Sequence, residues 1–361
     1  MMMLGWVKSK WRYFVVAALL IFLVLIPFDW FLGHYTSIMI FIGISTMITV
    51  GLCLLMGYTG QVSLGQAAYY GLGAYFSAVL SKTYGWNPWL AMVVAAIATG
   101  SFAYIIGYPI FRLRGNYLAM ATLGIGLIMW VLFNQLSQYT GGPDGMSGIP
   151  YLSIGGFSFD TNFKRYFLVW FFCLAVLFLS QNIVRSRTGR ALRAIHGNEA
   201  AAQSLGINVT QFKVKIFVLS SVYASLAGSL FAHHLRHVSP QSFDFLASVK
   251  LVVMAVIGGL ASVWGAIFGA GTTRILSDKL LLGFNQFPQL DIIIYGLILM
   301  LVMIFTPEGL FIALKSGIKW LQLNWRHLPE IMRTQGKEMP HRIKDRMSRL
   351  VPARLCRKTE P

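Results

Sequence analysis

The residues that could do chemistry gather in two polar stretches of an otherwise apolar chain. The first stretch, residues 57–66 (GYTGQVSLGQ), combines glycines with hydroxyl and amide side chains. Its Gly-x4-Gly spacing resembles a phosphate-binding loop, but Gln66 occupies the position where such a loop requires lysine. The stretch therefore predicts no nucleotide site. Gln61, Ser63 and Gln66 could instead line a polar path through a membrane, or the stretch could be a tight turn between two helices.

The second polar stretch, residues 185–209 (RSRTGRALRAIHGNEAAAQSLGINV), is strongly basic. Four arginines open it, and the run from Glu199 to Ala202 is typical of a short helix that Gly206 would end. We expect a helix–turn–helix outside the membrane, at which a partner protein could apply force. The alternative is that Arg190 and Arg193 only bind anionic lipid.

No catalytic or metal-binding pattern occurs in the sequence. The chain contains neither Gly-x-Ser-x-Gly nor His-Glu-x-x-His. His233, His234 and His237 are the densest group of possible metal ligands, but no carboxylate or cysteine stands at ligand spacing beside them. The three cysteines are far apart and form no Cys-x-x-Cys pair. We therefore expect no catalytic residue, no metal and no cofactor in this chain.

Composition places the chain in a membrane. Hydrophobic residues make up 56% of its 361 residues and charged residues only 12%, and the mean hydropathy is +0.64. Four runs contain no Asp, Glu, Lys or Arg: residues 37–81, 83–111, 115–143 and 166–184. Because a helix needs about 20 apolar residues to cross a bilayer, these runs predict an all-α polytopic membrane protein.

The formal net charge of +18 does not indicate nucleic-acid binding. From Lys315 onward there are 12 Lys or Arg against 4 Asp or Glu, and most other cations lie in short loops between apolar runs. Cations placed in this way are typical of the cytoplasmic side of a membrane protein and of contact with anionic lipid. We expect both termini in the cytoplasm and a basic cytoplasmic tail.

About ten transmembrane or re-entrant helices fit this pattern. Their expected positions are 13–28, 37–56, a third that ends near 80, 89–111, 117–136, 166–184, 212–232, 249–257, a ninth that begins near 262, and 291–305. The expected organisation is an N-terminal transmembrane half (1–184), a cytoplasmic coupling loop (185–210), a C-terminal transmembrane half (211–310) and the tail (311–361). Paired glycine breaks near Gly57 and Gly258 indicate a transport path, although close helix packing would also explain Gly258 and Gly259.

Six motifs, in order, resemble the branched-chain amino acid permease family of ATP-binding-cassette importers. They are GYTGQVSLGQAA (57–68), LRGNYLA (113–119), TGG through GIP (140–150), AAQSLGINV (201–209), VIGGL (256–260) and PEGL (307–310). The loop at residues 189–202 is similar to the loop by which importer permeases dock onto their ATPases. The resemblance covers about residues 45–310, and it is more specific for the family than for the substrate.

This resemblance implies an importer permease fold with a cytoplasmic coupling helix, in the inner membrane of a bacterium. The implied partners are a homologous second permease, two ATPase subunits that bind the ATP and Mg²⁺, a periplasmic substrate-binding protein and membrane lipid. The implied cargo is branched-chain amino acids, with urea, short amides or other amino acids as alternatives. A stand-alone secondary transporter or channel is the alternative of a different class.

Three groups of residues are candidates for these functions. The substrate path would comprise Gly57, Tyr58, Thr59, Gly60, Gln61, Ser63, Gln66, Gly258 and Gly259. ATPase coupling would involve Arg190, Arg193, Glu199, Ala200, Ala201 and Gly206. A binding protein would contact Gly141, Gly142 and Asp144, in a loop that could also be only a turn. The sequence departs from the family at Gln66, where many members have His, and by one extra residue between Glu199-Ala200-Ala201 and its glycine.

Overall fold

The computed structural model describes residues 36–113, 115–154, 157–283, 296–297 and 300. These residues belong to one compact unit that spans residues 1–312. The expected first span (13–28), most of the expected last span (291–305) and the basic tail (311–361) lie outside the described residues.

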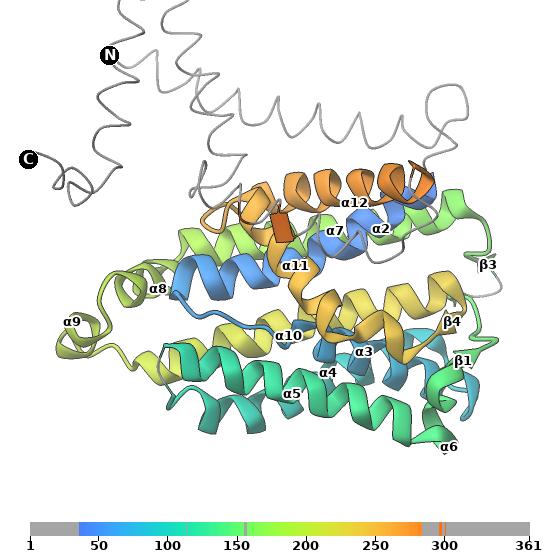
Figure 1. Ribbon diagram of the computed structural model, residues 1–361, viewed down its shortest axis with the longest axis horizontal. Helices are drawn as coiled ribbons and strands as arrows, with labels where there is room; N and C mark the ends of the chain where they lie inside the picture. The colour runs from blue at the N-terminus through green and yellow to red at the C-terminus, as the bar shows by residue number, and fades with distance from the viewer. Residues whose placement is uncertain (1–35, 114, 155–156, 284–295, 298–299, 301–361) are drawn as a thin grey trace, which may run out of the picture. The chain divides into compact units, whose positions relative to one another are not determined.

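Helices form most of the described chain (Figure 1). The longer ones are α2 (Thr36–Leu52), α3 (Gln66–Lys82), α4 (Pro88–Ile110), α5 (Asn116–Gln135), α7 (Asn162–Arg185), α8 (Arg187–Gly197), α10 (Val209–Leu235), α11 (Phe245–Gly258) and α12 (Gly265–Gly283). Five segments are long and apolar enough to cross a membrane: Thr36–Gly57, α4, α5, α7 and α10. This confirms the expected all-α polytopic fold.

The remaining elements are short and join the long helices. They are the π-helix η2 (Cys53–Gly57), α6 (Ser137–Thr140), η3 (Gly142–Asp144), α9 (Glu199–Ser204) and η4 (Pro240–Phe243). Two antiparallel pairs of short strands complete the set: β1 (Met146–Ser147) with β4 (His237–Val238), and β2 (Ser153–Ile154) with β3 (Phe157–Ser158). The β1–β4 pair joins the loop after α6 to the end of α10.

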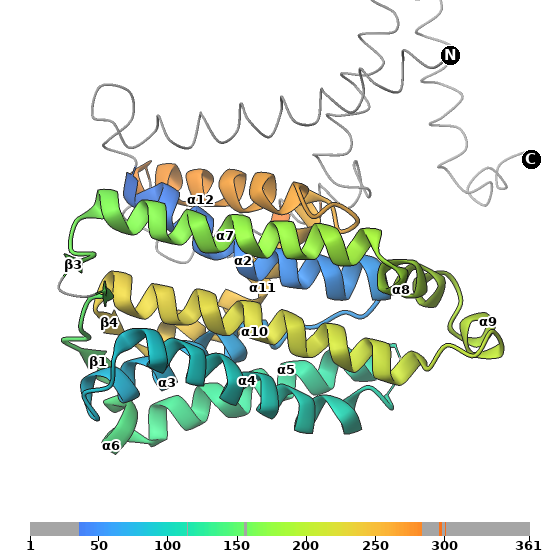
Figure 2. The ribbon, with the colours of Figure 1, turned by 180° about the vertical axis from the view of Figure 1, so that it is seen from behind.

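The helices before and after the basic stretch pack into one bundle. α2 lies against α7, α10 and α12, and α10 also lies against α3 and α4. The long helices run roughly along one common direction, with α8 and α9 protruding at one end and α6, β1 and β4 at the other (Figures 1 and 2). The bundle therefore has two distinct ends, which are called the α8–α9 end and the strand end below.

The central contact of the bundle is between α3 and α10, and small residues make it close. A Cβ atom at Gly73 would overlap the backbone of Ser225, and one at Gly228 would overlap the carbonyl of Tyr70. Helices in a membrane associate through such close packing because lipid gives no hydrophobic drive between them. Ser229 reinforces the contact by donating its hydroxyl to the Gly73 carbonyl at 3.1 Å.

The predicted break near Gly258 is confirmed. α11 ends at Gly258, α12 begins at Gly265, and the two helices pack against each other. Gly258 and Gly265 approach so closely that a Cβ on either would overlap the other's carbonyl, and Gly259 has a φ of +94° in the turn. One straight span over residues 249–271 is therefore excluded.

The α3–α10 contact gives a test on stability. We expect Gly73→Ala to lower the free energy of unfolding by about 1–3 kcal/mol, because the new methyl group meets backbone that cannot yield. Gly124→Ala on α5 is the matched control, since nothing lies within 4 Å of its Cβ position. Thermal unfolding of the purified protein in detergent should show a lower midpoint for the first variant only. Equal midpoints would contradict the contact.

Candidate functional site

The helix that precedes residues 57–66 ends in an unusual way. Its last turn widens into the π-helix Cys53–Gly57, a form that is rare and often found at functional sites. The backbone N–H groups of Gly60 and Gln61 donate to carbonyls within this π-helix. Gly60 has a φ of +70°, which glycine adopts without steric cost. The chain then continues as a non-helical segment, residues 60–65, before α3 begins.

The polar side chains of the non-helical segment are buried, whereas Gly60 and Val62 are exposed. Gln61 is 7% exposed and Ser63 is 1% exposed. Hydroxyls from other helices bind backbone amides at its exit: Leu64 N donates to Thr122 Oγ1 on α5, and Ala67 N donates to Ser248 Oγ on α11, both at 3.1 Å. Two other helices, α5 and α11, thus bind the backbone where the segment ends.

Gln66 starts α3 in the interior of the bundle. Its buried amide nitrogen donates to the carbonyl of Ser220 at 3.0 Å and to the Ser220 hydroxyl at 2.8 Å. Ser220 lies near the middle of α10, so the non-helical segment leads from the α8–α9 end into the bundle. The Gln66 Oε1 atom and the Ser63 hydroxyl have no hydrogen-bond partner within the described part of the chain. Both can accept a hydrogen bond from a polar group that enters there.

The two predicted glycine breaks meet in space. A Cβ at Gly57 would overlap the carbonyl of Leu260, and the Tyr58 hydroxyl donates to the carbonyl of Ala261 at 2.8 Å. The turn that follows Gly258 and Gly259 therefore sits directly against the end of η2. Gly258 and Gly259 themselves shape this turn.

α8 is amphipathic and lies at the end of the bundle. Leu192 and Ile195 are buried, whereas Arg190 and Arg193 are exposed. The Arg193 guanidinium donates to the carbonyl of Val184 at 3.4 Å, which closes α8 onto the end of α7. One face of the helix is thus anchored to the bundle and the other presents positive charge.

The short helix α9 confirms the predicted Glu-Ala-Ala-Ala helix. Asn198 caps it, since its Oδ1 accepts hydrogen bonds from the backbone of Ala200 and Ala201 at 3.0 and 3.1 Å. Gly206, with a φ of +81°, follows its end as predicted. Ala202 packs with Ile195 and Val209 into a small cluster that ties α8, α9 and the start of α10 together.

The outer surface of α9 and the residue after it are uncovered, and this surface combines Ala200 and Ala201 with the polar Gln203 and Ser204. Ala200 and Ala201 are exposed, and the Leu205 side chain is 78% exposed. Glu199 differs from its neighbours because its carboxylate points to the bundle, where Oε1 lies 2.6 Å from Lys213 Nζ. Of the predicted coupling residues, Ala200 and Ala201 are thus placed to meet a partner directly, and Glu199 is engaged inside the chain.

The predicted docking residues Gly141, Gly142 and Asp144 lie at the strand end. Gly141 has a φ of +79° and ends α6, while Gly142 is buried in the following turn. Asp144 is exposed. The two glycines therefore shape the turn, and only Asp144 offers a charged side chain to a partner at this surface.

Residues 146–154 and 157–159 form a cover segment that is fixed to the bundle at the strand end. Trp89 Nε1 donates to the carbonyl of Ser153, and Arg236 Nε donates to the carbonyl of Ile149, both at 2.9 Å. His233 lies 2.7 Å from the Pro150 carbonyl through Nδ1 and 2.9 Å from the Ser77 hydroxyl through Nε2. A carbonyl only accepts, so Nδ1 carries the proton and Nε2 accepts from Ser77.

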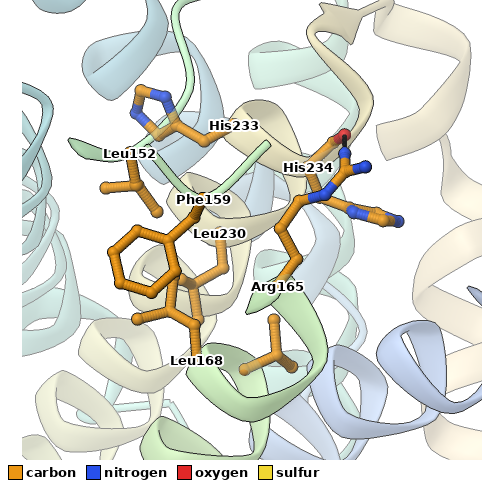
Figure 3. A pocket seen from close by; sticks show the side chains of 8 residues that line it. Leu152, Phe159, Arg165, Leu168, Leu230, His233 and His234 are labelled. Atoms are coloured by element: carbon orange, nitrogen blue, oxygen red, sulfur yellow. Dashed lines mark hydrogen bonds between the residues drawn. The ribbon is translucent and has the colours of Figure 1, made fainter. Parts of the chain in front are cut away.

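Figure 3 shows the small cavity beneath the cover segment, with His233, His234, Leu152 and Phe159 around it. The Arg165 guanidinium donates to the carbonyl of His234 at 2.7 Å and so joins α7 to the end of α10. His233 and His234 are thus structural members of this end of the bundle.

A bundle of membrane-spanning helices that encloses a polar non-helical segment and presents an anchored helical pair at one end defines a multi-pass membrane permease. The family model described as "Branched-chain amino acid transport system / permease component" matches residues 34–303. The chain belongs to this family. The predicted family is therefore confirmed; five of the six motifs lie within the matched residues, and PEGL (307–310) lies beyond them.

Curated relatives agree with this assignment. The chain is 32% identical over 297 residues to the high-affinity branched-chain amino acid transport system permease protein LivM of Salmonella typhimurium, covering 74% of this chain and 69% of that protein. LivM of Escherichia coli K12 is 31% identical over 293 residues, 75% of this chain and 68% of that protein. LivH of Escherichia coli K12 is 26% identical over 280 residues, 73% of this chain and 90% of that protein.

The roles of several residues at these sites cannot be identified from the sequence. Ser220 and Lys213 lie in the apolar α10, where a serine looks like a packing residue and a lysine looks like a topology marker. Leu205 stands outside the alanine-rich helix in sequence, yet at 78% exposed it is the most exposed large hydrophobic residue in the described part of the chain. Asn198 could have been found, because asparagine before Glu-Ala-Ala is a common helix-capping signal.

The Gln66–Ser220 contact predicts a coupled pair. Gln66→Leu should lower the free energy of unfolding by about 1–3 kcal/mol, because it leaves the Ser220 carbonyl without this donor. Ser220→Ala should cost about 1 kcal/mol in the wild-type background and little in the Gln66→Leu background. Thermal unfolding of both single variants and the double variant measures the coupling. Gln203→Leu, an exposed glutamine on α9, is the control; additive effects of Gln66→Leu and Ser220→Ala would contradict the contact.

Proposed function

We propose that this chain is the permease subunit of an ATP-binding-cassette importer that moves branched-chain amino acids into the cytoplasm. The observation that carries the proposal is the α8–α9 pair, which is anchored on one face and free on the other. Leu192, Ile195 and Ala202 hold the inner face, while Ala201 and Leu205 are exposed on the outer face. A rigid element of this kind can pass the movement of a bound ATPase to the membrane helices.

In this proposal the α8–α9 end faces the cytoplasm. Basic side chains dominate it: Arg112, Arg185, Arg187, Arg190, Arg193, Lys213 and Lys215. Glu199 is the acidic side chain that lies among them. Such an excess of cations is characteristic of cytoplasmic loops. The proposal also has both termini of the chain in the cytoplasm of a bacterial cell.

The proposed complex contains two different permeases, two ATPases and a periplasmic binding protein. Relatives named LivM and LivH both match this chain, which supports a pair of homologous permeases. The ATPases bind ATP and Mg²⁺, since the Gly-x4-Gly run of this chain is followed by Gln66 instead of the lysine that a phosphate-binding loop needs. The binding protein delivers substrate at the strand end, beside Asp144.

The non-helical segment lies on the substrate path in this proposal. Ser63 and the free Gln66 oxygen supply hydrogen-bond acceptors inside the bundle, and the amino group of an amino acid supplies the donors. When the ATPases bind ATP, movement of α8 and α9 shifts the segment at Gly60 and the adjoining turn at Leu260. The path then changes between inward-open and outward-open states.

Purification of the tagged chain from its native membrane tests the assembly. We expect a second permease and ATPase subunits in the purified complex, identified by mass spectrometry. Leu205→Asp should reduce the recovered ATPase about tenfold, because the exposed apolar contact becomes charged. Leu235→Asp, at the strand end of α10 and 44% exposed, should leave recovery unchanged. A homogeneous single-chain protein without ATPase would overturn the proposal in favour of a secondary transporter.

The substrate class is tested by uptake into proteoliposomes that contain the whole complex and its binding protein. Labelled leucine should enter in an ATP-dependent way, and excess isoleucine or valine should compete with it. Urea and acetamide serve as the matched competitors for the alternative cargo. Competition by urea or acetamide, without competition by isoleucine, would assign the importer to that alternative class.

A further inference from the structure

Glu199 has two partners inside the chain, and both belong to other elements. Its Oε1 atom accepts from Lys213 Nζ at 2.6 Å and from Gln61 Nε2 at 3.4 Å. Lys213 lies on α10 and Gln61 lies on the non-helical segment. One carboxylate oxygen therefore connects α9, α10 and the segment that leads to Gln66.

We propose that Glu199 is a positioning residue that transmits movement of the α8–α9 pair to the non-helical segment, and that it does not itself contact the ATPase. This inference rests on the proposed function, because it assigns an internal role within the coupling loop of that importer. It separates the docking surface of the loop from the part that acts on the transport path.

Burial makes the Glu199–Lys213 pair obligatory. The Lys213 side chain is 3% exposed, whereas the Glu199 side chain is 38% exposed. A buried ammonium group without its partner is strongly unfavourable, since neither water nor lipid replaces the carboxylate. If a docked ATPase displaces α9, the Glu199 carboxylate moves with it. Because breaking the ion pair with the buried Lys213 is unfavourable, α10 moves together with α9.

The non-helical segment is held by a second contact beside the first. His196, near the end of α8, lies against Gly60, so close that Nδ1 would be 3.0 Å from a Cβ at that position. Gln61, the next residue, is held to Glu199 and also donates to the carbonyl of Thr59 at 3.1 Å. Two successive residues of the segment thus touch the junction of α8 and α9, and the segment cannot stay in place when that junction moves.

The orientation of Glu199 leaves the outer surface of α9 to the partner. Ala200, Ala201 and Leu205 face outward, and the carboxylate faces inward. A direct ATPase contact by Glu199 would require the carboxylate to leave Lys213. The geometry thus divides the short helix into a docking face and a transmitting face.

The test uses the complete complex in proteoliposomes and measures recovered ATPase, ATP hydrolysis and substrate uptake. Glu199→Gln should keep normal ATPase recovery and ATP hydrolysis, but uptake per ATP should fall about tenfold because the coupling is lost. The charge exchange Glu199→Lys with Lys213→Glu should restore uptake per ATP toward the wild-type value. Lys215→Met is the matched control, because Lys215 is an exposed lysine two residues from Lys213.

Other outcomes overturn the inference. Loss of ATPase recovery in Glu199→Gln, without rescue by the charge exchange, would make Glu199 a direct ATPase contact. Unchanged uptake per ATP in this variant would leave it without a role in coupling. The double variant Glu199→Gln with Lys213→Met removes both charges, so that no unpaired charge is left buried to cause misfolding. It should remain folded, as judged by size-exclusion chromatography, and should still show low uptake per ATP. Normal uptake per ATP by this variant would contradict the inference. Absence of ATPase from the wild-type complex would reject the proposed function instead.

Discussion

The structure depends on keeping a polar, non-helical backbone inside a membrane bundle. Peptide groups outside a helix have no water to bind at that depth, so other parts of the protein must bind them. Thr122 and Ser248 do this for the exit of residues 60–65, and Ser220 holds the side chain at which α3 restarts. The arrangement of α3, α5, α10 and α11 around the segment follows from this requirement.

α10 makes a functional or structural contact near its start, near its middle and near its end. Lys213 lies near its start beside α9, Ser220 holds Gln66 near its middle, and His233 fixes the cover segment near its end. Between these points Ser225 and Gly228 pack closely on α3. A helix with so many contacts inside the protein is not a simple lipid-facing span. This agrees with the buried fraction of an apolar 18-residue stretch of the helix, which is 72%.

The sequence predicts local features of this protein well. Charge-free runs locate the helices, glycines locate the two breaks, and the alanine-rich run locates α9. Each of these signals lies within one continuous stretch of the sequence. The helix-ending position of Gly206 and the division of residues 249–271 follow from the same kind of local rule.

Contacts between distant residues are what the sequence does not predict. Gln66 and Ser220 are 154 residues apart, and Gln61 and Glu199 are 138 apart. Nothing in the local pattern distinguishes a serine that packs from a serine that binds an amide. Lys213 shows the same limit, because a lysine at the start of a span normally marks the cytoplasmic side, whereas burial beside Glu199 makes this one part of the interior.

The fixed ends of α10 have a thermodynamic consequence. The helix has 27 residues and at 1.5 Å per residue is about 40 Å long; it is bound to α9 at one end and to the cover segment at the other. If a ligand at one end favours one position of this rod, a ligand at the other end that favours the same position binds more tightly. The free energy of that linkage is equal in both directions. A ligand at the strand end and a ligand at the α8–α9 end must therefore strengthen or weaken each other's binding by the same factor.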